Sequence, residues 1–473
     1  MEYKSFEAVI GLEIHCELKT SSKVFCSCPT DFDAEPNTLC CPVCLGLPGA
    51  LPALNRQAVE LAVKAGLVLG CEISEYSKFD RKNYFYPDLP KGYQISQYDI
   101  PLCKNGKVEI ELDGEKKQIG ITRIHVEEDA GKLIHDKSGT LIDFNRCGVP
   151  LIEIVTEPDI RTAEEAKAFV RKLRTLILYS GASDCKMNEG SMRVDVNLSV
   201  RKIGDTALGT RTEMKNINSV NFIGRAIEYE FHRQVDAILA GEKIVQETRR
   251  YDQNLGVTLS MRKKENLSEY RFFPEPNIPP LVVLKEEIVR LSHELPTLPD
   301  DRKAEYIAKF SLTPYDADLI TESRTAADYF ESAVDHTKYP KLLGNLFIGE
   351  MLAKQTDEDE EFKLRPEYLA EIADLLGDGT INSGTAKEII AGGETVSPKE
   401  IVTRDGLARI TDQDKLKEYI NQAFSEMPKA IADYKKGKTA ALKSIVGRVM
   451  GITKGKADTA ILSDLVEQEA KKL

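Results

Sequence analysis

The chain has 473 residues, 30% of them charged, and a formal net charge of −12 at pH 7. This length predicts two to four domains, and the negative charge excludes a protein that coats nucleic acid through bulk positive charge. No stretch approaches the roughly 18 consecutive apolar residues that a membrane helix needs, and the N-terminus is charged where a targeting segment would be apolar. We therefore expect a cytoplasmic protein with no membrane partner.

The first predicted element is a strand over residues 9–15. Strand alternation places Glu13 and His15 on one face. A carboxylate and an imidazole on one face can hold a metal ion, although such a pair is more often simply solvated. The strand alone therefore leaves both interpretations open.

A cluster of cysteines follows this strand. Six of the ten cysteines fall within residues 16–44, and in a reducing compartment such clustering indicates metal binding. The close pairs predict a zinc knuckle over residues 26–44, a structural tetrahedral zinc site whose ligands are Cys26, Cys28, Cys41 and Cys44. Cys16 and Cys40 remain alternative ligands, and a set of free buried cysteines is the competing interpretation.

Residues 78–98 interleave cations with aromatic rings. Arg81, Lys82 and Lys91 alternate there with Tyr84, Phe85, Tyr86, Tyr93 and Tyr98. Cations and stacking rings together can hold the single-stranded end of an RNA. The alternative is a proline-bent loop whose rings pack under the sheet.

Three further strands are predicted at residues 107–112, 119–126 and 151–157. Asn105-Gly106 and Asp113-Gly114 flank the first of them and are typical of two-residue hairpin turns, so we expect antiparallel pairing. In segments 123–129 and 151–157, acidic residues occur within a pattern of alternating apolar residues. Three strands that offer carboxylates toward one cleft would bind a hard cation such as Mg²⁺, and magnesium beside Arg and Lys is typical of a polyphosphate site.

Two helices are predicted within this sheet region, at residues 162–181 and 219–240. The first begins with the capping box Thr162-x-x-Glu165 and ends at Gly181. Beyond the proline-rich stretch 274–280 the chain is predicted to be helical. No G-x-G-x-x-G follows a strand and no complete P-loop is present, so ATP would bind through side chains and metal on an antiparallel sheet.

These patterns predict an α+β fold with an antiparallel-sheet cradle domain, a helical domain and a small helical tail, with boundaries at residues 1–293, 294–405 and 406–473. The tail differs from the rest in charge: residues 410–473 hold 12 basic and 9 acidic side chains. Within them, residues 434–456 carry seven cations and no acid. We expect this segment to contact nucleic-acid phosphates, the alternative being a solvated helix face.

Long blocks of the sequence closely resemble the B subunit of the aspartyl/glutamyl-tRNA(Asn/Gln) amidotransferase, and the resemblance covers essentially the whole chain. The blocks are VIGLEIH at 9–15, DRKNYFYPD at 80–88, YQISQ at 93–97, HVEEDAG at 125–131, DFNRCGVPLIE at 143–153, RTEMKNINS at 211–219, QETRR at 246–250 and YRFFPEP at 270–276. Runs of this length are far more specific than a short motif.

The resemblance implies a ligase. The family reaction uses ATP to phosphorylate the side-chain carboxylate of glutamate or aspartate misacylated on tRNA, and ammonia then displaces phosphate to leave the amide. It also implies a heterotrimer with a glutaminase (the A subunit) and a small C subunit, with misacylated tRNA(Gln) or tRNA(Asn) as substrate and the non-discriminating synthetase as a further partner. The competing hypothesis is a non-catalytic tRNA-binding adaptor.

The resemblance also implies site residues. As catalytic magnesium ligands it indicates Glu13, His15, Glu128 and Glu153. Glu127 and Glu157 remain rivals, because a single-residue bulge would exchange the faces of a strand. As cations that contact ATP it indicates Arg81, Lys82, Lys215, Arg249 and Arg271.

Overall fold

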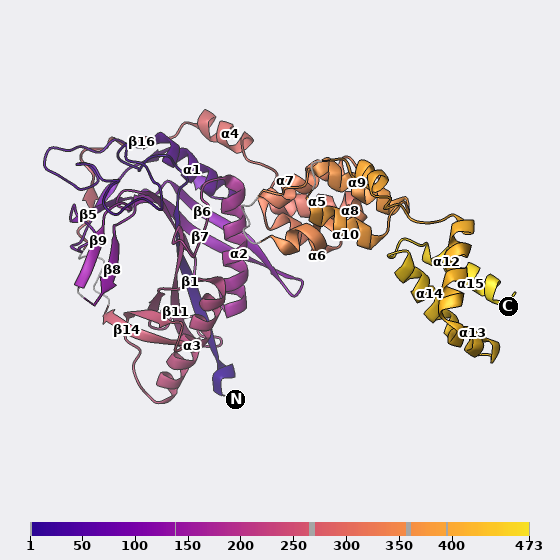
Figure 1. Ribbon diagram of the computed structural model, residues 1–473. Coiled ribbons are helices and arrows are strands. Elements are labelled where there is room, and N and C mark those ends of the chain that lie inside the picture. The colour runs from indigo at the N-terminus through magenta and orange to yellow at the C-terminus, as the bar shows by residue number, and fades with distance from the viewer. Residues whose placement is uncertain (1, 138, 264–269, 356–360, 394–395, 473) are drawn as a thin grey trace. The chain divides into compact units, whose positions relative to one another are not determined.

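The computed structural model describes residues 2–137, 139–263, 270–355, 361–393 and 396–472 (Figure 1). The chain forms two compact units, Met1–Leu298 and Pro299–Leu473. The first unit ends a few residues beyond the predicted boundary at 293, because Leu295 and Leu298 still pack on its hydrophobic core. The hydrophobic core residues of each unit cluster within that unit.

A nine-stranded sheet forms the centre of the first unit, in the order β14-β13-β12-β11-β1-β10-β7-β6-β2. Its strands are β1 (Phe6–Glu17), β2 (Glu72–Ile73), β6 (Cys103–Leu112), β7 (Glu115–Glu128), β10 (Pro150–Thr156), β11 (Met192–Lys202), β12 (Thr212–Lys215), β13 (Glu247–Asp252) and β14 (Val257–Lys263). All neighbouring pairs are antiparallel except β12 with β13. The predicted α+β class with an antiparallel sheet is confirmed.

Short strands build three smaller sheets in the same unit. They are β15 (Phe273–Pro274) with β4 (Asp80–Asn83) and β5 (Tyr93–Ser96), β16 (Leu281–Val282) with β3 (Tyr76–Ser77), and β8 (Lys132–Asp136) with β9 (Gly139–Asp143). In Figure 1 the β8–β9 hairpin lies on the opposite side of the large sheet from helix α2. The large sheet therefore has one face covered by helices and one face turned toward these smaller elements.

Helices α1 (Arg56–Val68), α2 (Ala163–Ser180) and α3 (Val220–Leu239) pack against the apolar face of the sheet. Helix α2 begins where the capping box predicts, since the Thr162 hydroxyl accepts from the Glu165 backbone N–H at 3.1 Å, and it ends at Gly181 in the left-handed region. Helix α1 was not predicted, although Asn55 caps its N-terminus and Ala58, Val59, Ala62 and Val63 repeat at helical spacing.

The predicted turn at Asn105-Gly106 is wrong. Strand β6 runs through both residues, and of the two predicted turns only Asp113-Gly114 forms one, with both residues at positive φ. Asn105 adopts a left-handed φ of 54° inside the strand. At Gly106 a Cβ atom would lie 2.3 Å from the Cys71 Sγ, so the glycine permits a close approach here and does not reverse the chain.

The first unit also contains η1 (Glu2–Ser5) and α4 (Lys285–His293), and the second unit is helical. Its elements are α5 (Pro299–Phe310), α6 (Pro314–Thr321), α7 (Arg324–Val334), α8 (Pro340–Leu346), η3 (Phe347–Met351), η4 (Leu352–Lys354), α9 (Pro366–Gly377), α10 (Ser383–Gly392), α11 (Pro398–Arg404), α12 (Gln413–Glu426), α13 (Pro428–Lys435), α14 (Ala441–Ile452) and α15 (Thr459–Ala470). Two hydrophobic clusters form within it, one from α5 to α11 and one from α12 to α15. None of the described helices has the length and apolar character that a bilayer crossing requires.

Candidate metal and phosphate site

The register of the large sheet separates apolar from ionisable side chains. The even-numbered residues of β1 are apolar and lie toward the helices. Ile14, for example, pairs with Ile154 on β10 and Val194 on β11, and these three side chains are buried. The odd-numbered neighbour His15 pairs with Glu153 on the opposite face. Strand alternation therefore collects the ionisable groups on one face, here called the polar face.

Four neighbouring strands contribute to an acidic cluster on the polar face, defined as Glu13, His15, His125, Glu127, Glu153 and Asp195. The His15 Nε2 lies 3.4 Å from the Glu153 Oε2, 3.6 Å from the Glu127 Oε1 and 3.9 Å from the Glu13 Oε1. The His125 Nε2 lies 3.4 Å from the Glu127 Oε2 and 3.5 Å from the Glu153 Oε2. Two of the predicted ligands, His15 and Glu153, therefore lie together, with Glu13 beside His15.

Burial and neighbouring charges shift the pKa values of the side chains in the acidic cluster. Burial opposes ionisation of Glu127 and Glu153, but the adjacent histidines hold the pKa of each carboxyl below its usual value. Burial opposes charging of His125 as well, yet Glu153 and Glu127 raise its pKa to about 9. Burial and the charge of Glu153 raise the pKa of Glu13. Two ionised carboxylates thus share a small buried volume, an arrangement that a cation stabilises.

Two of the predicted ATP-contacting cations lie beside this cluster. The Lys82 Nζ lies 5.2 Å from the centroid of the Tyr270 ring. Its burial would lower the pKa, but the charges of Glu127 and Glu153 raise it. Lys215 forms ion pairs with Asp195 and, at 3.4 Å, with Glu213. Both ammonium groups therefore stay charged next to the carboxylates.

The structure does not bring Arg81, Arg249 and Arg271 to the acidic cluster. The Arg81 Nε donates to the Glu275 Oε2 at 2.5 Å, and its guanidinium lies over the Tyr93 ring. Arg271 is exposed, with φ at 44°.

Arg249 pairs in register with Met214, which belongs to the apolar face. Its guanidinium donates to the Thr258 hydroxyl at 2.9 Å and lies 3.4 Å from Glu230 on α3. Arg249 therefore stabilises the helix side of the sheet and does not face the cluster.

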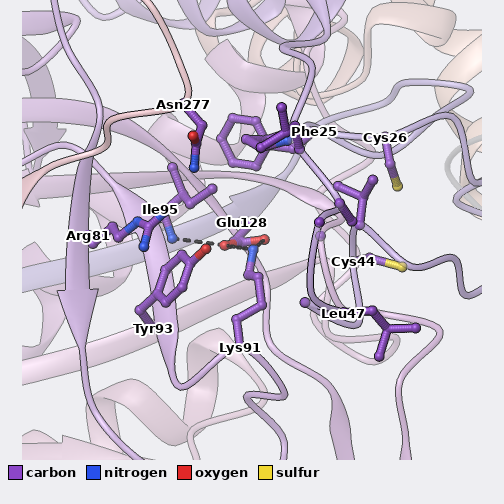
Figure 2. A pocket seen from close by; sticks show the side chains of 17 residues that line it. Phe25, Cys26, Cys44, Leu47, Arg81, Lys91, Tyr93, Ile95, Glu128 and Asn277 are labelled. Carbon is purple, nitrogen blue, oxygen red and sulfur yellow. Dashed lines mark hydrogen bonds and ion pairs between the residues drawn. The ribbon is translucent and has the colours of Figure 1, made fainter.

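Glu128 also lies apart from the acidic cluster, because adjacent strand residues point to opposite faces. Its carboxylate pairs with Lys91 and accepts from the Ile95 backbone N–H at 2.8 Å (Figure 2). These groups line a cavity of about 260 Å³. The rival Glu127 occupies the place in the cluster that the prediction gave to Glu128. The second rival, Glu157, is exposed and accepts from the Thr122 hydroxyl.

The donor set of the acidic cluster fits a hard divalent cation. One ligand atom each from His15, Glu127 and Glu153 lies within 4.8 Å of the others, and the same holds for Glu13, His15 and Asp195. Carboxylate oxygens are the donors that Mg²⁺ prefers, and a single imidazole is compatible with them. Asp195 was not among the predicted ligands, although Met192, Val194, Val196 and Leu198 alternate with polar residues and so place Asp195 on the polar face.

The four predicted zinc ligands, Cys26, Cys28, Cys41 and Cys44, lie together with their sulfur atoms within 4.8 Å of one another. A four-thiol group of this kind fits structural zinc. A hydrogen bond with Cys26 lowers the pKa of Cys44 to about 4, so this thiol is ionised as a metal ligand must be.

The buried Lys23 supports this thiol group. Its Nζ lies 3.7 Å from the Cys44 Sγ and donates to the Leu39 carbonyl at 2.7 Å. The two alternative ligands lie apart from the four thiols: Cys40 faces the Asn145 side chain, and Cys16 is buried beside Cys185. A tetrathiolate site therefore needs only the four predicted cysteines, and Lys23 offsets part of its negative charge.

Known protein families match both units of the chain. The family described as GatB/GatE catalytic domain matches residues 8–290, and the family described as GatB domain matches residues 328–469. The B subunit of the aspartyl/glutamyl-tRNA(Asn/Gln) amidotransferase of Caldicellulosiruptor saccharolyticus is 51% identical over the full length of both chains. The B subunits of the same name from Carboxydothermus hydrogenoformans and Thermoanaerobacter pseudethanolicus are 48% and 49% identical, over 99% of this chain and 100% of theirs. The chain therefore belongs to the GatB family, the B subunits of aspartyl/glutamyl-tRNA amidotransferases, which are amide-forming ligases.

Proposed function

We propose that this chain is the component that activates misacylated tRNA in a glutamine-dependent amidotransferase. It uses ATP to phosphorylate the side-chain carboxylate of Glu-tRNA(Gln), Asp-tRNA(Asn) or both. Ammonia from a glutaminase partner then attacks the acyl phosphate, so that a carbon–nitrogen bond forms, the carbon–oxygen bond to phosphate breaks, and inorganic phosphate leaves. The observation that carries this proposal is the acidic cluster with Lys82 and Lys215 beside it on the polar face.

The geometry suits phosphoryl transfer. The transferred group spreads negative charge over its oxygens, so fixed positive charge in a partly buried site stabilises the transition state. Lys82 and Lys215 supply such charge from side chains that the adjacent carboxylates hold in place. Glu13, His15, Glu127, Glu153 and Asp195 would hold Mg²⁺, which when bound neutralises phosphate oxygens. The attacking group is the ionised carboxylate of the substrate, which needs no general base.

The basic tail supports a tRNA substrate. Lys435, Lys436, Lys438 and Lys443 are exposed at the end of α13 and the start of α14. Gly447 and Gly451 lie on the exposed side of α14, where no described atom lies within 4 Å of the position that a Cβ atom would take, so a phosphate backbone can approach the helix closely. We propose that residues 406–473 capture tRNA, and that a glutaminase (the A subunit) and a small C subunit complete the enzyme.

ATP cleavage by the complete complex tests the proposal. The reconstituted trimer should cleave ATP only when misacylated tRNA is present, and each equivalent cleaved should yield one amidated aminoacyl-tRNA. Separate assays with Glu-tRNA(Gln) and Asp-tRNA(Asn) identify the substrate. A non-catalytic adaptor would bind the same tRNAs, and replacing residues of the acidic cluster would not change ATP cleavage by its complex.

A further inference from the structure

Two adjacent aromatic side chains stand exposed three and four residues beyond Lys82, which lies beside the acidic cluster. Phe85 is 86% exposed and Tyr86 is 56% exposed, in the loop that follows β4. The sequence left two interpretations of this loop open, and the structure excludes the one in which these two rings pack under the sheet. Exposure of this extent removes almost none of the Phe85 ring from water, so the ring contributes little to folding.

The Phe85 ring is supported along one edge. It lies over Gly92, where a Cβ atom would meet the Phe85 Cε1 at 3.3 Å and the Cδ1 at 3.5 Å. Gly92 has a φ of +73°, a conformation that glycine adopts without strain. The glycine therefore lets one edge of the ring approach the backbone, and the 86% exposure of Phe85 leaves its faces open to a stacking partner.

The loop is anchored at the acidic cluster. Lys82, at the end of β4, faces Glu127 and Glu153 and lies over the ring of Tyr270, and Tyr84 meets the same ring edge-on with centroids 6.0 Å apart. Phe85 follows Lys82 by three residues, so their Cα atoms lie at most about 11 Å apart. The loop that carries the open ring thus begins at Lys82, whose ammonium group faces the carboxylates.

We propose that Phe85 stacks the terminal base of the single-stranded 3′ end of the substrate RNA. This inference rests on the proposed function and names the subsite that holds the RNA end. In an aminoacyl ester only the terminal ribose and the amino-acid chain separate the reacting carboxylate from the base, so a carboxylate at the acidic cluster brings the base to this loop. The positive charge of Lys82 matches the anionic strand, and aromatic stacking accepts any base.

Fluorescence of the complete heterotrimer with an acceptor-stem minihelix tests the proposal. The minihelix carries 2-aminopurine as its terminal base, whose emission is quenched when it stacks. The unaltered complex should quench the probe. Phe85→Ala should abolish quenching and weaken minihelix binding by about 5- to 150-fold, the range for loss of one stacked base. Phe85→Tyr should retain both properties, because it keeps an aromatic face.

Two further variants separate stacking from other roles. Phe85→Leu keeps apolar area without an aromatic face and should behave like Phe85→Ala. Tyr315→Ala removes a ring that is 71% exposed on the second unit and should change neither quenching nor affinity. The proposal is overturned if Phe85→Ala binds and quenches normally, if Phe85→Leu matches the unaltered protein, or if Phe85→Ala prevents trimer assembly, which would assign the ring to a protein interface. Because the assay measures binding without ATP, failure of the phosphorylation chemistry would not mimic any of these results.

Discussion

Replacing Glu127 or Glu128 with glutamine should have opposite consequences for ATP cleavage, although the two residues are adjacent on β7. Glu127 lies in the acidic cluster, whereas Glu128 pairs with Lys91 on the other side of the strand. Both substitutions remove one negative charge and keep the size of the side chain. They therefore form a matched pair that tests where the metal and phosphate site lies.

Glu127→Gln should abolish tRNA-dependent ATP cleavage and leave the protein folded. A metal ion contributes several kcal/mol to stabilising a transferred phosphoryl group, and each 1.36 kcal/mol is a factor of ten, so we expect a rate loss of at least about a hundredfold. The hydrogen bond from the Ser96 hydroxyl, 3.0 Å in length, can be kept by the amide oxygen. Because His125 stabilises the charge of Glu127 in the folded protein, the melting temperature should fall, and ATP cleavage is compared at a temperature where the variant is folded.

Glu128→Gln should also lower stability, but it should spare ATP cleavage. Lys91 and Glu128 are both buried, and breaking a buried ion pair costs about 3–5 kcal/mol. The glutamine oxygen can still accept from Lys91, so the lower value applies, and at about 2 °C per kcal/mol for a large domain the melting temperature should fall by about 6 °C. ATP cleavage by the folded complex should stay within a few-fold of the unaltered rate.

The assay pairs thermal unfolding of each variant with ATP cleavage by reconstituted trimer, after size exclusion has verified assembly. Glutamine hydrolysis by the glutaminase partner serves as the internal control for an intact complex. Full ATP cleavage in Glu127→Gln, or its loss in Glu128→Gln at a temperature where that variant is folded, would refute the assignment of the site to the polar face.

Three further outcomes are expected. Freshly purified protein should contain one zinc ion per chain, and Cys41→Ser should remove it whereas Cys40→Ser should not, as metal analysis will show. Lys82→Met should raise the KM for ATP by about 10- to 100-fold, the effect of losing a charged contact, while Arg249→Met should leave that KM unchanged and lower the melting temperature. Truncation at residue 406 should raise the KM for misacylated tRNA and flatten the salt dependence of binding by about one unit of slope per lost phosphate contact, with glutamine hydrolysis retained.

Each of these outcomes has a contrary result. If zinc-free protein has normal stability, the four cysteines are free thiols and do not form a structural zinc site. An unchanged KM for ATP in Lys82→Met would remove the phosphate role from that side chain. If the truncated complex keeps its tRNA affinity and salt slope, the positive charge of the tail serves another purpose.

Strand alternation made much of the acidic cluster predictable. Glu13, His15 and Glu153 alternate with buried isoleucines, so their common face follows from the sequence. The same rule places Glu127 beside His125, because Ile124 and Val126, which alternate with them, are buried. The resemblance nevertheless indicated Glu128, and the position of the Glu128 side chain depends on Lys91, a partner far away in the sequence.

The pairing of distant strands could not be predicted from local pattern. Arg249 and Lys215 are both cations on short strands, and only the parallel register of β12 with β13 decides that Arg249 shares a face with Met214. Asn105-Gly106 has the residues of a hairpin turn, but the close approach of Cys71 and Leu69 requires the glycine inside a strand. Both outcomes depend on tertiary contacts that outweigh local preference.

The continuous pairing of β1 limits where the chain can change length. Strand β1 is paired on both sides, with β11 from Phe6 to Cys16 and with β10 from Glu13 to Glu17. Insertion of one residue before Glu13 would turn Glu13 and His15 toward the helices and expose Ile14 in their place. Insertions and deletions should therefore be accepted at hairpin tips such as Asp113-Gly114, where no Cβ contact constrains Gly114, and rejected throughout the four strands that carry the site.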